Sequence, residues 1–226
     1  MSSSGKFKVV LFDLGGTLVK TPEFSKTYRK ILGRYGVKVS SDDVVYAHRA
    51  REKEFNVEQM VELGRSFWVK WNSKVLEALG IIGNREFLAR KIDELWWENA
   101  ELDTYPDVVQ TLVQLREKGI KVGVVTNALE KDYKQILQRL GLTSYFDVAV
   151  GIDTCKRVKP DKAIFLYAVD ALNVHPKETI FVGDSIKYDY RGAKKAGLKP
   201  LLIHREGKAL KNVETITNLA EVLSYF

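Results

Sequence analysis

The sequence has very little cysteine, no long apolar segment and no concentrated basic tract. A single cysteine, Cys155, excludes an intrachain disulfide, and no nucleophile motif surrounds it. No apolar run approaches the about 20 residues of a membrane-spanning helix, and the polar first residues lack the apolar block of a signal peptide. We therefore expect a cytoplasmic protein without a membrane partner.

The net charge is positive but evenly distributed. The formal charge is +7, yet lysines and arginines are interspersed with acids. Signatures of helix-turn-helix, zinc-finger and RNA-binding proteins are missing. We expect no nucleic-acid partner, and a positive surface of this kind can instead steer an anionic small molecule towards a cleft.

Apolar runs of strand length alternate with helical patterns in most of the chain. Strands are expected at Lys8–Phe12, Val122–Thr126, Val148–Gly151, Thr179–Val182 and Leu198–Ile203. Helices are expected at Pro106–Lys118, Lys131–Leu140, Lys162–Leu172 and Tyr188–Ala196. This alternation predicts an α/β fold with a Rossmann-like parallel sheet.

The interval 21–103 breaks the alternation because it contains helical patterns only. Helices are expected at Phe24–Tyr35, Asp42–Glu62, Phe67–Leu79 and Arg85–Asn99. An all-helical insert after the first strand is typical of a cap, a domain that excludes water when it closes. We predict a core of residues 1–20 and 104–226 and a helical cap of residues 21–103.

Polar residues occupy four separate segments, each at or beyond the carboxyl end of a predicted strand. They are Asp13 with Thr17, Thr126 with Asn127, Lys159, and Asp184 with Asp189. Open α/β sheets bind ligands beyond the carboxyl ends of their strands. We therefore expect these side chains to converge on one site.

The four segments, in this order and over the whole core, resemble the motifs of the haloacid dehalogenase superfamily, whose members are mostly phosphohydrolases. The helical insert resembles the cap of its best-populated subclass. The resemblance implies that Asp13 is a nucleophile that forms an aspartyl-phosphate, a reaction available to carboxylates. It implies that Thr126 and the neighbouring Asn127 bind the phosphate, and that Lys159 neutralises charge on the nucleophile and on the transferring group.

The resemblance also implies a Mg²⁺ cofactor, a cation that prefers oxygen ligands. Its ligands would be Asp13, the backbone carbonyl of Gly15 and Asp184, with Asp189 nearby. Phosphatases of the superfamily usually carry a second aspartate where this chain has Gly15. That aspartate acts as general acid and base, a contribution of about 10²–10⁴-fold in rate.

The missing acid leaves several functions open. A phosphatase could take the proton from water, a cap residue or the substrate itself. A 2-haloacid dehalogenase needs no such acid, although Asp184 matches it poorly, and a phosphonatase-like hydrolase would use a cap lysine. A phosphate-binding or interaction module without catalysis has no reason to keep the other site residues together.

We favour a Mg²⁺-dependent phosphohydrolase that acts on a small phosphate ester. A triose phosphate such as glyceraldehyde 3-phosphate is a candidate by family analogy. We expect the protein to be a monomer or a homodimer.

Overall fold

One parallel sheet of six strands organises the larger part of the chain. The strands are β1 (Val9–Phe12), β2 (Lys121–Val125), β3 (Val148–Val150), β4 (Thr179–Gly183), β5 (Lys199–Ile203) and β6 (Thr215–Ile216). They lie in the order β3-β2-β1-β4-β5-β6, and every neighbouring pair is parallel. The predicted sheet is confirmed, whereas the two-residue β6 was not predicted because so short a strand has no periodicity to detect.

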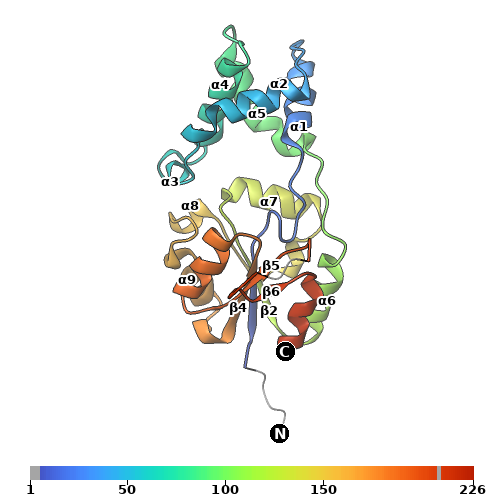
Figure 1. The fold of residues 1–226 in the computed structure, drawn as a ribbon, viewed down its shortest axis with the longest axis vertical. Coiled ribbons are helices and arrows are strands. Elements are labelled where there is room, and N and C mark those ends of the chain that lie inside the picture. The colour runs from blue at the N-terminus through green and yellow to red at the C-terminus, as the bar shows by residue number, and fades with distance from the viewer. Residues whose placement is uncertain (1–5, 208–209) are drawn as a thin grey trace. The chain divides into compact units, whose positions relative to one another are not determined.

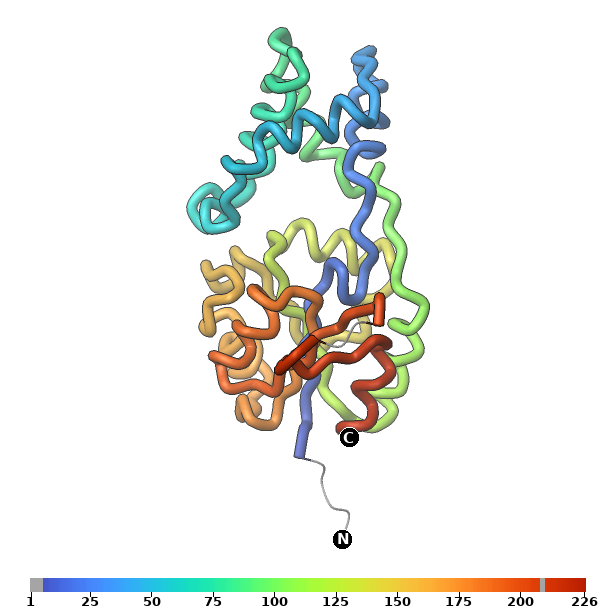
Figure 2. Tube along the Cα trace, in the orientation of Figure 1, coloured from blue at the N-terminus to red at the C-terminus, as the bar shows by residue number. Residues whose placement is uncertain are grey.

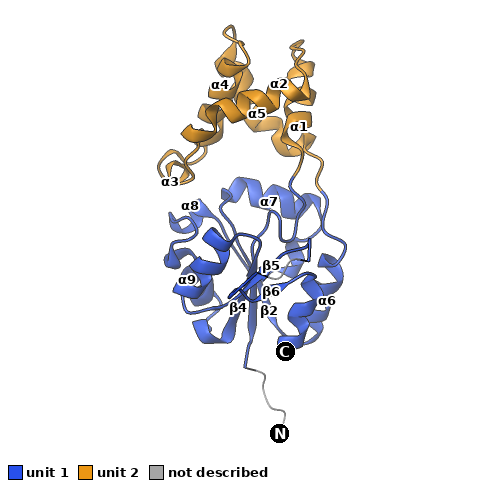
Figure 3. Cartoon of the chain, in the orientation of Figure 1, with its two compact units in different colours: residues 1–21, 103–226 blue, residues 22–102 orange. Residues whose placement is uncertain are grey.

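The computed structural model describes residues 6–207 and 210–226, so the first five residues of the predicted core lie outside the described part. The chain divides into two compact units (Figure 3). Unit 1 contains residues 1–21 and 103–226, and unit 2 contains residues 22–102.

Helices cover both faces of the sheet (Figure 1). They are α6 (Val108–Glu117), α7 (Glu130–Arg139), α8 (Ile152–Cys155), α9 (Lys162–Ala171), α10 (Arg191–Lys195) and a final 3-10 helix, Leu219–Tyr225. Every residue of β1 and β4 is buried, as central strands covered on both faces require. On the α9 face, the ring of Phe165 packs edge-on against Phe181, with 4.9 Å between ring centroids.

Helices and no strands make up the regular secondary structure of unit 2, residues 22–102, which the structure describes in full. It consists of α1 (Phe24–Arg34), α2 (Ser41–Arg51), α3 (Gln59–Leu63), α4 (Ser66–Ala78) and α5 (Arg85–Asn99), with a 3-10 turn at Glu52–Glu54. The prediction of one helix over Asp42–Glu62 is wrong. The Asn56 side chain accepts a hydrogen bond from the Glu58 N–H at 2.8 Å, and such local bonds compete with helix continuation.

Unit 2 has its own core of aliphatic and aromatic side chains from α1, α2, α4 and α5. Within it, the buried Tyr28 hydroxyl donates to the Asn72 amide oxygen at 2.6 Å. Among the helices that the structure describes, none has the length and apolar character needed to cross a membrane.

The chain leaves unit 1 and returns to it along two adjacent segments, which Figure 2 lets the reader trace. The Lys20 N–H donates to the Asp103 carbonyl at 2.9 Å, and the Tyr105 N–H donates to the Leu18 carbonyl at 3.2 Å. The Lys20 ammonium also pairs with the Asp103 carboxylate at 2.5 Å. The segment after β1 is therefore tied to the segment before α6.

The packing of α9 on the sheet predicts a large cost for truncating Phe165. Phe165→Ala should lower the free energy of unfolding by about 3–5 kcal/mol, because a buried aromatic ring is lost and a cavity remains. Tyr167 lies on the same helix and is 44% exposed, so Tyr167→Ala should cost about 0.5 kcal/mol or less. Urea unfolding followed by circular dichroism measures both, and equal costs would contradict this packing.

Candidate active site

The first element of the site is the turn that follows β1. The Asp13 N–H donates to the Val182 carbonyl at 2.9 Å, so the nucleophile candidate continues the sheet for one further residue. The chain then turns back, with the Val19 N–H donating to the Leu14 carbonyl and the Gly16 N–H donating to the Val19 carbonyl. Asp13 is thereby held at the carboxyl edge of the sheet, where α/β folds bind ligands.

Two glycines permit close contacts around the carboxylates. Gly16 has a φ of +78°, and a Cβ there would lie 2.3 Å from an Asp184 carboxylate oxygen. A Cβ at Gly183, the last residue of β4, would lie 2.4 Å from the Asp189 carboxyl carbon. Any side chain at either position would displace an acid of the site.

Lys159 is buried between two of the acids. Its ammonium donates to Asp13 Oδ1 and, at 2.7 Å, to Asp189 Oδ1, and its side chain is 3% exposed. Burial raises the pKa of Asp13 to about 7 against the opposing effect of Lys159, and the charge of Asp189 adds to the rise. Burial alone would lower the pKa of Lys159, but the two acids raise it above its ordinary value. Lys159 is therefore held as an ammonium.

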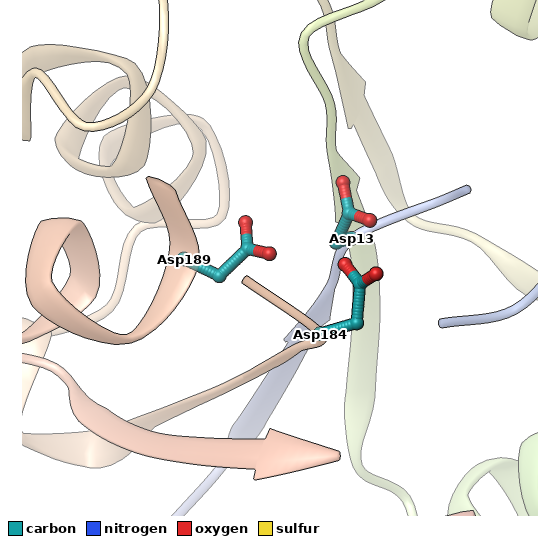
Figure 4. A group of neighbouring side chains, drawn as sticks. All are labelled: Asp13, Asp184 and Asp189. Atoms are coloured by element: carbon teal, nitrogen blue, oxygen red, sulfur yellow. The ribbon is translucent and has the colours of Figure 1, made fainter. Parts of the chain in front are cut away.

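The three acids offer oxygen ligands to a cation. One carboxylate oxygen from each of Asp13, Asp184 and Asp189 lies within 4.8 Å of the others. Figure 4 shows these carboxylates gathered beyond the ends of β1 and β4. An all-oxygen donor set is the one that Mg²⁺ prefers, and three carboxylates exceed the charge of Lys159, so the residues present are compatible with that ion.

The acids differ in how they are held. Asp184 presents an exposed surface, while partial burial of its carboxylate and the charge of Asp189 raise its pKa above the ordinary value. Asp189 is buried, with Oδ1 bound to Lys159 and Oδ2 accepting from the Ser185 N–H at 2.9 Å. Asp184 is therefore the acid more open to an arriving ion, whereas Asp189 also orients Lys159.

Thr126 and Asn127 follow β2, beside β1 in the sheet. The Thr126 N–H continues the ladder to the Val150 carbonyl, and Thr126 is 5% exposed. The Asn127 side chain accepts from the Lys159 N–H at 2.7 Å and donates to the Lys159 carbonyl at 3.2 Å. The sequence predicts Asn127 as a phosphate ligand and misses this clamp, because nothing in a Thr-Asn pair indicates a partner 32 residues away.

Gly15 has open space around it. A Cβ built there meets no atom within 4 Å, and its backbone does not require glycine. The absent side chain is therefore not excluded by crowding, in contrast to Gly16.

The family model for haloacid dehalogenase-like hydrolases matches residues 7–197. The chain is 42% identical over 106 residues to the glyceraldehyde 3-phosphate phosphatase of Methanopyrus kandleri, a match that covers 47% of this chain and 46% of that protein. It is 30% identical over 198 residues to the phosphoglycolate phosphatase of Aquifex aeolicus, covering 86% and 84% of the two chains.

The fold is shared with a solved structure of the same family. The HAD phosphatase of Thermococcus onnurineus is 30% identical to this chain and superposes with a TM-score of 0.64, with coverage of 96% and 97%. The family predicted from the four motifs and the fold class predicted from the alternation of strands and helices are confirmed.

The buried position of Lys159 predicts that its removal destabilises unit 1. Lys159→Met should lower the free energy of unfolding by about 3–5 kcal/mol at neutral pH without added divalent cation, because two buried carboxylates lose their counter-charge. The matched control is Lys162→Met, three residues along the chain and exposed, which should change stability little. A Lys159→Met protein as stable as the parent under these conditions would contradict the description of the cluster.

Proposed function

We propose that this chain, which belongs to the haloacid dehalogenase-like hydrolases whose family model matches residues 7–197, is a phosphatase. It hydrolyses a small phosphate monoester through a covalent intermediate on Asp13 and depends on Mg²⁺. The observation that carries the proposal is the buried Lys159 ammonium bound to both Asp13 and Asp189, with Asp184 beside them.

Asp13 is the proposed nucleophile. One of its carboxylate oxygens attacks phosphorus, the bond from phosphorus to the ester oxygen breaks, and an aspartyl-phosphate forms. Water then attacks this phosphorus, which releases inorganic phosphate and restores the Asp13 carboxylate. Lys159 offsets negative charge during both steps, and Thr126 donates a hydrogen bond to a phosphate oxygen, as does the Asn127 backbone N–H.

Asp13, Asp184 and the Gly15 carbonyl are the proposed ligands of Mg²⁺, with Asp189 close by. The bound ion would supply positive charge next to the phosphoryl oxygens. The support for this assignment is the chemistry of the donor set and the exposure of Asp184.

The leaving oxygen needs a proton whenever it departs as an alkoxide, and Gly15 offers no side chain to supply one. We therefore propose that water or the substrate supplies it, and that leaving groups of low pKa react fastest. Acyl and aryl phosphates have such leaving groups. Among alkyl esters, triose phosphates such as glyceraldehyde 3-phosphate are the proposed substrates, supported by the name of the Methanopyrus relative.

A phosphate-release screen tests the reaction. The expected result is release from small phosphate esters that requires Mg²⁺ and disappears in Asp13→Asn. Absence of release from every metabolite, acyl and aryl phosphate, with or without metal, would exclude the phosphatase function. Halide release from 2-haloacids that survives a chelator would instead identify a dehalogenase, the alternative that the missing acid favours.

The open space at Gly15 leads to a second prediction. Gly15→Asp places a carboxyl group where a proton donor is missing, so it should raise the rate on alkyl esters by up to about 10²–10⁴-fold and change acyl phosphates little. The control is Gly15→Asn, which has nearly the same shape but no carboxyl proton. Equal rates for the two variants on alkyl esters would show that proton donation does not limit the reaction.

A further inference from the structure

Arg205 lies two residues after the end of β5, at the carboxyl edge of the sheet. Its guanidinium donates to both carboxylate oxygens of Asp107, at 3.1 and 2.8 Å, and to the Thr17 carbonyl at 2.8 Å. It also lies 3.7 Å from the centre of the Tyr105 ring. The side chains of Arg205 and Asp107 are only 21% and 8% exposed, so this ion pair is well shielded from water.

Asp107 is fixed from a second direction. It precedes α6, and its Oδ2 also accepts from the Leu219 N–H at 2.7 Å, at the start of the final 3-10 helix. Burial favours the protonated form, but the hydrogen bonds from Arg205 and Leu219 outweigh it and hold the pKa of Asp107 below its ordinary value. The carboxylate is thus a charged anchor that sets the direction of the guanidinium.

The Thr17 carbonyl belongs to the turn that carries the proposed nucleophile. Thr17 is fully buried, and its hydroxyl lies 3.5 Å from Asp13 Oδ2, a long hydrogen bond. The next residue, Leu18, accepts at its carbonyl from the Tyr105 N–H. Arg205 therefore contacts the segment after β1, at Thr17, and also the segment before α6, at Tyr105 and Asp107.

We propose that Arg205 is a positioning residue for the Asp13 reaction, an inference that rests on the proposed function. Within the described part of the chain, its polar contacts are with Asp107 and Thr17 and not with Lys159 or the three acids of the site, so it acts by holding the carbonyl of Thr17. The planar guanidinium binds Asp107 through Nη1 and the Thr17 carbonyl through Nη2, a fixed fork that a lysine ammonium lacks. Loss of Arg205 lets the 14–19 turn shift relative to the carboxyl edge of the sheet.

The test compares three variants of the full chain. Arg205→Met removes the guanidinium and keeps an apolar stem, while Arg205→Lys keeps the charge alone. Arg116→Met is the control, because Arg116 forms another Arg–Asp pair of unit 1, with Asp147 at 2.7 Å, whose arginine is 44% exposed. The first measurement is hydrogen–deuterium exchange of the peptides covering residues 14–20 and β4.

Faster exchange at residues 14–20 is expected in Arg205→Met, with β4 still protected and Arg116→Met unchanged. The same variant should lose about 10- to 100-fold in kcat, the size expected for a small misplacement of reacting groups, with KM little changed. Arg205→Lys should recover part of kcat, and added guanidinium ion at non-denaturing concentration should partly rescue Arg205→Met.

Two results would overturn the proposal. One is unchanged exchange at residues 14–20 in both Arg205 variants, and the other is a normal kcat in Arg205→Met. Should Arg205→Met not fold, shown by loss of β4 protection, the comparison of Arg205→Lys with the parent decides by the same exchange. If the parent releases no phosphate, the proposed function fails, and the exchange result still determines whether Arg205 holds the turn.

Discussion

The contact of the Lys159 ammonium with Asp13 and Asp189 is the interaction on which the site depends. Removing three charged groups from water is costly, and only mutual pairing and further hydrogen bonds offset that cost. The chain provides those bonds from separate elements. Asn127 holds the Lys159 backbone from the end of β2, and the Ser185 N–H holds Asp189 after β4. The parallel sheet brings these strand ends to one edge, and the buried charges are stabilised only because the sheet places them together there.

The two glycines that follow Asp13 differ in whether packing requires them to be glycine. Gly16 cannot carry a side chain without displacing Asp184, so its identity follows from packing and backbone angle. Gly15 is under no such constraint in the structure. Packing therefore does not explain why a carboxyl group is missing at this position. We infer that the pKa of the substrate's leaving group determines how much the missing proton donor slows the reaction.

The sequence predicted much of this arrangement because strands and their terminal acids have local signals. Asp13, Lys159, Asp184 and Asp189 each stand next to an apolar run or a helix start, and the structure brings them together. The break between α2 and α3 has a local signal that the helical pattern does not reveal, the Asn56 side-chain bond to the Glu58 N–H two residues further on. Two other features have no local signal, because the Asn127 clamp joins residues 32 positions apart and Arg205 looks like any arginine of a basic chain. Long-range partners of this kind require coordinates.

The central claim is that Asp13 accepts a phosphoryl group. Rapid acid quenching during turnover of an acyl phosphate, followed by mass analysis of the peptides, tests it most directly. The account predicts one phosphoryl group on the peptide containing Asp13 and none on that peptide in Asp13→Asn. Phosphate release at the parent rate by Asp13→Asn, or a phosphoryl group trapped on a different residue, would contradict it.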